Sequence, residues 1–330
     1  DQDVVIVGGG AAGWWLAHEL STMQIATTLV DTEPSARFSS TRNQGWLQSG
    51  ALYAINNDPD TARECNAGYQ QLEQFDSDCL NHDVSSYCLF RERSERQDAL
   101  ERCAALGISA EPMLSSVVAQ LHPLLTATSL PYALEVQDRP VDTHRLLTKV
   151  AGQATALGLQ FHMVQDLRTT EIVQTTAGWS VILDGERRVN ARAVVLACGT
   201  LIPKLLKAHE PEAAAGMSIE RVGVMVLHQP VSRAMLITPV EKEGPNLVPF
   251  GWPTVQGATV CLARADRPAI DENDYRLNIE SSADPNEYVF RHVNALQTIY
   301  PGIFNVVKGR GIPLHFYACP KLKFKRGEGA

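Results

Sequence analysis

The chain has 330 residues, of which 45% are hydrophobic and 20% charged, and a formal net charge of −8 at pH 7. This composition is typical of a globular protein, and the length allows two domains or one large one. The negative charge argues against a nucleic-acid-binding surface, and no apolar run reaches the ~18 residues that cross a bilayer.

The seven cysteines are scattered and include no C-x-x-C pair. This pattern favours reduced thiols over a disulfide framework, and it predicts no metal site. We therefore expect a cytoplasmic protein. Because the N-terminus opens almost directly into an apolar run typical of a buried strand, we expect no signal or transit peptide, although the absence of an initial Met leaves a processed precursor open.

The first stretch carries the strongest motif. Residues 4–7 form a β-branched run typical of a strand buried on both faces, and Gly8, Gly10 and Gly13 follow as G-x-G-x-x-G before an expected helix. The first glycine permits a tight turn, the second lets backbone approach a pyrophosphate, and the third allows close helix–strand packing. The helix N-terminus behind them attracts phosphate. The motif predicts a dinucleotide site, the alternative being a glycine-rich turn in an unrelated α/β protein.

A second apolar run, residues 26–30, ends in Asp31, 18 residues beyond Gly13. At this distance an acidic side chain would receive the ribose hydroxyls of an adenine dinucleotide. The next segment, 39–50, is rich in hydroxyls, amides and glycines, which suit a loop lying across a polar ligand. An ordinary surface loop is the alternative.

The remaining elements follow from hydrophobic periodicity and turn residues. The predicted helices span 58–82, 92–106, 113–125 (ending in a loop), 145–157 with Asp142 as N-cap, and 287–300. The predicted strands are 87–90, 159–164 and 191–197, with a hairpin over 169–183. From Gly223 to residue 262, short apolar runs separated by turns predict an antiparallel sheet.

The order of these motifs resembles the FAD-dependent oxidoreductases of the D-amino-acid oxidase, glycine oxidase and sarcosine oxidase type. This superfamily also includes 2-hydroxyglutarate and glycerol-3-phosphate dehydrogenases. The resemblance covers residues 3–205 well, and the stretches that carry it are 5–13, 39–45, 139–147, 158–162 and 194–200.

The resemblance implies an α/β fold with two domains. A Rossmann-type FAD-binding domain would be assembled from the separated segments 1–83, 139–216 and 311–330. A substrate domain with a mixed or antiparallel sheet would come from 84–138 and 217–310.

FAD is the cofactor that the resemblance implies, with the glycines at the pyrophosphate, Asp31 at the adenosine ribose and the backbone of Leu167 at adenine. The residues implied to bind FAD are Gly8, Gly10, Ala11, Ala12, Gly13, Asp31, Thr32, Ser40, Thr41, Arg42, Gln44, Gly45, Leu47, Leu167, Ala197 and Gly199. The first motif with its acidic residue also suits NAD, whereas the later motifs favour FAD.

Two features depart from the family pattern. Trp14 and Trp15 stand where smaller residues are usual, and we expect them to pack under the sheet. The family's closing glycine-rich segment near the C-terminus is not found, which leaves three interpretations: an incomplete chain, a disordered tail, or an unusually open flavin site.

No catalytic residue is singled out, because the flavin carries the hydride chemistry and the protein positions the substrate. Each candidate has a structural alternative, either solvent exposure or core packing. The candidates are Arg42 and Gln44 in the presumed flavin loop, His228 as a base, Trp252 and Tyr317 as an aromatic wall, Cys319 as a flavin attachment point and Lys321 as a cation near the flavin.

The expected function is an FAD-dependent oxidoreductase that removes hydride from a CH–NH or CH–OH carbon of a small amino acid, amine or hydroxy acid. Amine oxidation is slightly preferred, with oxygen, a quinone or a partner protein as electron acceptor. The alternatives are a quinone-linked 2-hydroxy-acid or polyol-phosphate dehydrogenase and an FAD-binding subunit without independent turnover. The basic run at 321–326 leaves peripheral membrane association open.

Overall fold

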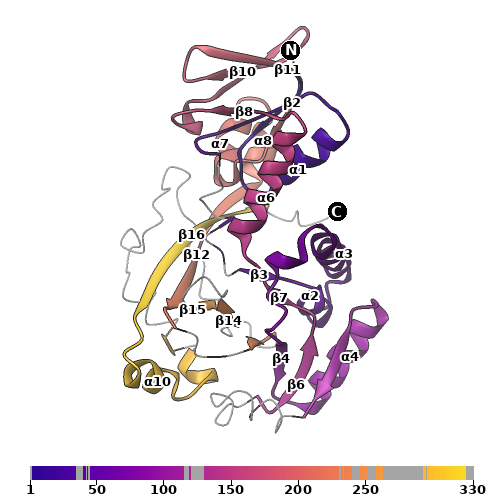
Figure 1. Cartoon of the computed structure of the whole chain (residues 1–330), viewed down its shortest axis with the longest axis vertical. Helices are drawn as coiled ribbons and strands as arrows, with labels where there is room; N and C mark the ends of the chain where they lie inside the picture. Colours follow the sequence, from indigo (N-terminus) through magenta and orange to yellow (C-terminus); the bar gives the residue numbers. More distant parts are fainter. Residues whose placement is uncertain are drawn as a thin grey trace.

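The fold consists of two β-sheets joined by a short two-stranded ribbon. The computed structural model describes residues 2–34, 40–41, 43, 45–114, 119, 130–229, 232, 234–239, 246–250, 258–262, 293–294 and 296–324. A six-stranded sheet lies in the upper part of Figure 1, an eight-stranded sheet lies below it, and the ribbon of β3 (Trp46–Leu47) and β7 (Arg139–Pro140) lies between them.

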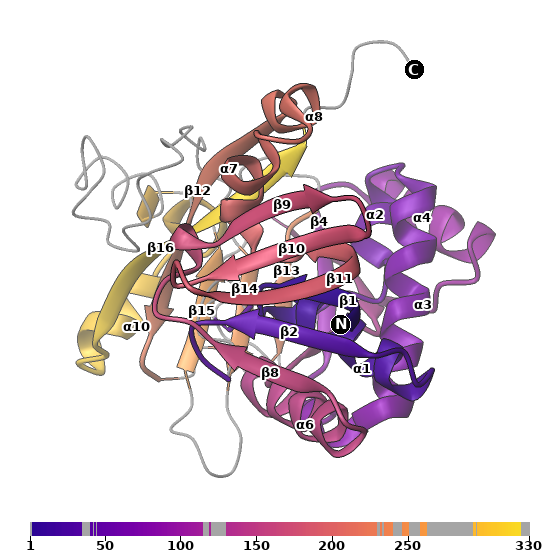
Figure 2. The same ribbon diagram turned by 90° about the horizontal axis from the view of Figure 1, so that it is seen from above.

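The six-stranded sheet has a parallel core and an antiparallel extension, and its strands lie side by side in Figure 2. Strands β8, β2, β1 and β11 are parallel, and β10 and β9 continue the sheet as an antiparallel hairpin. The bounds are β1 Gln2–Val7, β2 Thr27–Asp31, β8 Gln160–Met163, β9 Glu171–Thr175, β10 Gly178–Leu183 and β11 Arg187–Leu196. The predicted strands and hairpin of this region are confirmed.

Both faces of the sheet are covered at its central strand β1, as the unbroken apolar run of that strand predicts. Ile6 packs with Trp14 beneath α1 (Ala11–Thr22) and α6 (Thr143–Ala156), whereas Val5 and Val7 face a second cluster that includes α7 (Ile202–Leu206). Trp14 is 2% exposed and stacks on Phe161 with ring centroids 5.8 Å apart. The expectation that this tryptophan packs against the sheet is therefore confirmed.

The eight-stranded sheet is antiparallel except where β13 pairs with β4. Its order is β16-β12-β15-β14-β13-β4-β6-β5. The bounds are β4 Ser86–Phe90, β5 Ala110–Met113, β6 Tyr132–Val136, β12 Met217–Leu227, β13 Met235–Ile237, β14 Asn246–Phe250, β15 Ala258–Leu262 and β16 Leu314–Phe324. The antiparallel sheet expected after Gly223 is confirmed by the pairing of β12 with β15, of β15 with β14 and of β14 with β13.

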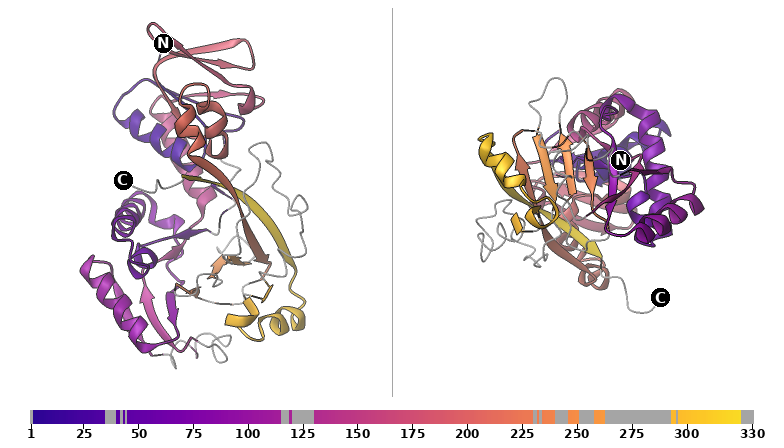
Figure 3. Two further views of the ribbon diagram at one scale, coloured as in Figure 1. Left: turned by 180° about the vertical axis from the view of Figure 1, so that it is seen from behind. Right: turned by 90° about the horizontal axis from the view of Figure 1, so that it is seen from below.

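Strand β16 is absent from the sequence-based prediction. It pairs with β12 over the whole length of both strands, from Met217 opposite Phe324 to Leu227 opposite Leu314. This pair forms the long arm that Figure 3 shows running from the upper sheet to α10 (Ile303–Gly309). Since β16 lies in the larger sheet, whereas the expected FAD-binding domain includes 311–330, the division into domains stays a proposal.

Helices α2 (Ala51–Ile55), α3 (Pro59–Asp76) and α4 (Arg93–Ala105) cover the larger sheet and the junction. Helix α8 (Pro211–Ala215) lies beside α7 in Figure 1. Helix α3 ends six residues before the predicted boundary, because a 3-10 turn (Ser77–Cys79) follows it. Most of 113–125 and part of 287–300 lie outside the described residues; Met113 ends β5 and is not helical.

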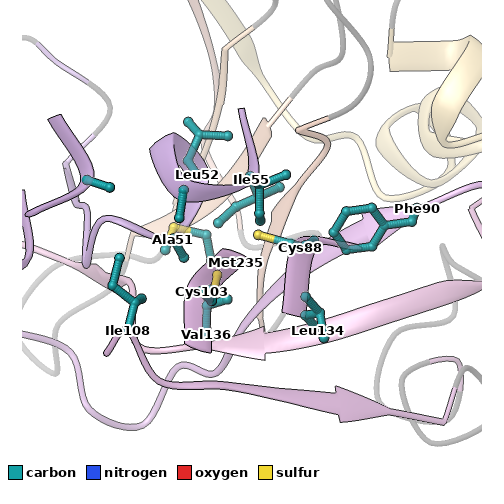
Figure 4. Packing of buried hydrophobic residues seen from close by; sticks show 14 of the residues in the cluster. Ala51, Leu52, Ile55, Cys88, Phe90, Cys103, Ile108, Leu134, Val136 and Met235 are labelled. Atoms are coloured by element: carbon teal, nitrogen blue, oxygen red, sulfur yellow. The ribbon is translucent and has the colours of Figure 1, made fainter. Parts of the chain in front are cut away.

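A compact apolar core joins these helices to the sheet. Figure 4 shows Leu52 and Ile55 of α2, Cys103 of α4, and Cys88 and Phe90 of β4 in one cluster. Cys88, Cys103 and Phe90 have no solvent exposure. This core holds the segment that follows the ribbon strand β3 against the larger sheet.

Candidate flavin site

At two positions in the turn between β1 and α1, neighbouring backbone atoms lie so close that only glycine fits. Gly8 has φ of +113°, and a Cβ added there would lie 2.5 Å from the backbone N and Cα of Cys198, beyond the end of β11. A Cβ at Gly13 would overlap the carbonyl oxygen of Gly8. These contacts bring the N-terminus of α1 against the carboxyl ends of β1 and β11, where ligands bind in open α/β sheets.

The first backbone N–H groups of α1 have no acceptor within the helix. Gly10 is the N-cap and has no side chain to satisfy them, and no acidic residue lies in the first turn. One N–H, that of Ala11, donates to Ser40 Oγ at 2.9 Å, and Ala11 and Ala12 are exposed. An exposed helix N-terminus with its partial positive charge fits a pyrophosphate.

Asp31 lies at the end of β2 beside this turn and is 8% exposed. Its Oδ2 accepts a hydrogen bond from the backbone N–H of Gly9, and its Oδ1 accepts from the backbone N–H of Thr32 at 2.5 Å and from Thr32 Oγ1 at 3.1 Å. These bonds fix the carboxylate next to the glycine turn. Each oxygen retains further acceptor capacity, so the side chain fits the ribose hydroxyls expected there.

The predicted flavin loop runs from this turn to the ribbon between the sheets. Ser40 and Thr41 are half-buried, whereas Arg42 and Gln44 lie outside the described residues. Gly45 has φ of +60°, and its carbonyl accepts from the backbone N–H of Val141 at 2.8 Å. Leu47 follows in β3.

The other predicted cofactor residues occupy the same edge of the sheet. The backbone N–H of Ala197 donates to the carbonyl of Val7 at 2.8 Å, and Gly199 is exposed, with φ of +58°, at the start of a 3-10 turn (Gly199–Leu201). Leu167 begins another 3-10 turn (Leu167–Thr169), and its side chain packs in the cluster that contains Val30. Its carbonyl accepts from Thr170 N at 3.2 Å, which leaves one lone pair for a ligand.

Sequence reasoning missed a buried carboxylate at the ribbon. Asp138 has no solvent exposure. It accepts from Trp46 Nε1 at 2.8 Å, from the backbone N–H of Ser49 at 2.7 Å and from Ser49 Oγ. Its carbonyl accepts from Ser86 Oγ in β4 at 2.6 Å and from Arg139 Nη1 at 3.0 Å. Asp138 thus ties the end of the flavin loop to the larger sheet.

Burial is the largest influence on the pKa of Asp138 and raises it, while the hydrogen bonds from Ser49 and Trp46 and the charge of Arg139 oppose that rise. No motif in the sequence marks this residue. Its function as a junction arises from three segments that are far apart along the chain.

Among the catalytic candidates, the structure describes the side chain of His228 alone. His228 is exposed beyond the end of β12, and its backbone N–H donates to the carbonyl of Pro313 at 3.0 Å. Only the backbone of β16 is described at Tyr317, Cys319 and Lys321, which pair with Val224, Val222 and Glu220. Trp252 lies outside the described residues.

Among the described residues, no helix is both long enough and apolar enough to cross a membrane. Over the same residues, no three His, Cys, Asp or Glu side chains are grouped as a metal site requires.

Comparison with known proteins extends these observations. Over 160 residues the chain is 30% identical to the anaerobic glycerol-3-phosphate dehydrogenase subunit A1 of Haloferax volcanii, an alignment that covers 47% of this chain and 26% of that protein. The chain thus matches about a quarter of the length of this curated relative.

Solved structures resemble the whole fold. Glycine oxidase from Geobacillus kaustophilus has a TM-score of 0.69 at 15% identity, covering 98% of this chain and 83% of the oxidase. L-alpha-glycerophosphate oxidase from Mycoplasma pneumoniae with FAD bound has a TM-score of 0.70 at 15% identity, with coverage of 98% and 84%. These likenesses establish the fold.

A family of FAD dependent oxidoreductases, the DAO family, matches residues 3–317. This match confirms the resemblance seen in the sequence and FAD as the cofactor in preference to NAD, and the solved structures confirm the two-sheet α/β fold. The chain belongs to the DAO family of FAD-dependent oxidoreductases.

Proposed function

We propose that this protein oxidises a small substrate at a CH–OH or CH–NH carbon, with FAD held at the turn between β1 and α1. The observation that carries the proposal is the convergence of the Gly8–Gly13 turn, the open N-terminus of α1 and the fixed carboxylate of Asp31 at one edge of the parallel sheet. When bound, FAD accepts the hydride that leaves the substrate.

The residues of this chain would bind and orient the cofactor. The N–H groups at the start of α1 would contact the pyrophosphate, and Asp31 would accept from the adenosine ribose. Leu167 would contact adenine through its backbone, while the loop containing Ser40, Thr41, Arg42, Gln44, Gly45 and Leu47 would follow the pyrophosphate toward the isoalloxazine. Ala197 and Gly199 would close the same edge. The proximity of Ser40 to Ala11 supports this path.

The substrate class that we favour is a small anionic hydroxy compound or amino acid. The sequence identity to a glycerol-3-phosphate dehydrogenase subunit supports the hydroxy branch, including a polyol phosphate oxidised with a quinone as acceptor. The structural likeness to glycine oxidase supports the amine branch. Because the sequence relative is named as a subunit, an FAD-binding module within a larger assembly is the third candidate.

We further propose a reducing, cytoplasmic compartment, with peripheral membrane association as the alternative for a quinone-linked enzyme. The free thiols of the described cysteines support a reducing environment.

An anaerobic substrate panel tests the function. The purified protein is loaded with FAD and mixed with glycerol 3-phosphate, lactate, glycine or sarcosine, and the visible absorbance of the flavin is followed. Bleaching by one compound identifies the branch, and peroxide release in air then identifies oxygen as the acceptor. Retention of FAD without bleaching by any compound would favour the module, and failure to bind FAD would refute the proposal.

A further inference from the structure

The segment that leaves the flavin loop is held at both ends by one buried carboxylate. Trp46 and Ser49 both donate to the carboxylate of Asp138, and the backbone carbonyl of Asp138 accepts from Ser86 Oγ in β4. Gln48, one of the two residues between them, is half-buried and directly follows β3, which Figure 1 shows between the two sheets. Its position is therefore fixed by neighbours on either side.

The amide oxygen of Gln48 is buried and has no hydrogen-bond partner in the structure. Burying an unpaired acceptor costs free energy, and such groups in native proteins call for an explanation. The indole of Trp46 and the backbone N–H and hydroxyl of Ser49, which flank Gln48 in the chain, all donate to Asp138. The fold thus leaves the Gln48 acceptor unused.

The paired strand leaves a donor unused as well. Arg139 lies opposite Leu47 in the ribbon, and its Nε is buried without a hydrogen-bond partner, whereas its Nη1 donates to the carbonyl of Asp138. A bound group with an N–H or O–H donor would satisfy the Gln48 oxygen, and a group with an oxygen acceptor would satisfy Arg139 Nε. The pyrimidine edge of the isoalloxazine has this chemistry, and so does a small amino or hydroxy acid.

We propose that Gln48 is a binding residue whose amide oxygen accepts a hydrogen bond from an N–H or O–H of the bound flavin or of the substrate. Asp138 is the positioning residue that holds Gln48 in place through Trp46 and Ser49. This inference rests on the proposed function.

The variant Gln48→Met tests it, because methionine has a similar length and shape but no amide. Ser180→Ala is the matched control, since Ser180 in β10 is 5% exposed and its hydroxyl is also buried without a partner. Each holoenzyme is assayed for the rate of FAD release, the flavin spectrum, and kcat and KM with the substrate identified by the panel. The loss of one net hydrogen bond corresponds to an effect of about tenfold.

The two sources of the donor give different results. If the flavin is the donor, Gln48→Met releases FAD about tenfold faster and changes the flavin spectrum before substrate is added. If the substrate is the donor, the spectrum and the release rate stay unchanged while kcat/KM falls about tenfold. Ser180→Ala changes none of these quantities.

An active wild-type enzyme with Gln48→Met unchanged in both FAD release and kcat/KM would overturn the inference. Gln48→Leu also removes the amide but leaves a branched side chain in place of the linear one of methionine. If neither variant folds while Ser180→Ala does, Gln48 has a structural role and the inference is again overturned. A wild-type protein that binds no FAD would instead refute the proposed function.

Discussion

At the residue scale, the absence of a side chain at Gly13 lets α1 pack closely against the turn that follows β1. Because a Cβ at this position would overlap the carbonyl of Gly8, we expect Gly13→Ala to push α1 away from β1. The variant should lose about 1–3 kcal/mol in free energy of unfolding, through overpacking, and retain little FAD. Urea unfolding and the ratio of bound flavin to protein measure both effects.

The matched control is Gly152→Ala in α6, where an added Cβ meets nothing within 4 Å. Alanine in a helix interior should raise the free energy of unfolding by about 0.5–1 kcal/mol and leave FAD bound. A Gly13→Ala protein that kept its flavin as well as this control does would contradict the close-packing explanation.

At the element scale, the ribbon of β3 and β7 depends on the hydrogen-bond donors that surround the carboxylate of Asp138. All three of its side-chain contacts are donors, from Trp46 and Ser49. An asparagine has one acceptor oxygen and one NH2 group. In Asp138→Asn the NH2 group would therefore face the indole N–H of Trp46 or the donors of Ser49. We expect the free energy of unfolding to fall by about 1–3 kcal/mol, as measured by urea denaturation.

Trp46→Phe removes the opposing indole donor, so it should cost less in the Asp138→Asn background than in the wild type. A double-mutant cycle measures this coupling. Strictly additive effects of the two substitutions would show that the indole–carboxylate bond does not hold the ribbon.

At the scale of the whole molecule, buried thiols predict how stability depends on pH. Burial raises the pKa of Cys79 and Cys198 to about 12 and that of Cys103 to about 11, from an ordinary value of 9.0. The folded state thus favours the neutral thiols. The contribution of the neutral thiols to the free energy of unfolding is complete below pH 9. It is lost as the pH rises through 11 to 12, because the thiols of the unfolded chain ionise at lower pH than those of the folded chain.

Urea unfolding on either side of pH 9 tests this expectation. The free energy of unfolding should be steady below pH 9 and decline above it, and Cys103→Ala should make the decline shallower. A stability that stays level up to pH 11, or an equally steep decline in the variant, would show that these thiols do not govern alkaline unfolding.

The sequence by itself determined the local elements around the cofactor. The glycine spacing and the β-branched run predicted β1, its turn and the start of α1, and the position of Asp31 after the second strand followed from the same unit. Asp142 was predicted as the N-cap of α6, and it accepts from Arg145 N at 2.9 Å. These features rest on residues close together in the chain, so propensity, capping and periodicity suffice to predict them.

The tertiary structure alone decided the features that join distant segments. Strand β16 was not predicted, because its pairing with β12 supplies the hydrogen bonds that make it a strand. Asp138 and Gln48 gain their significance from burial at the junction of the flavin loop, β4 and β7. Burial and long-range pairing depend on which surfaces meet in the folded chain, and neither is encoded in a short stretch of residues.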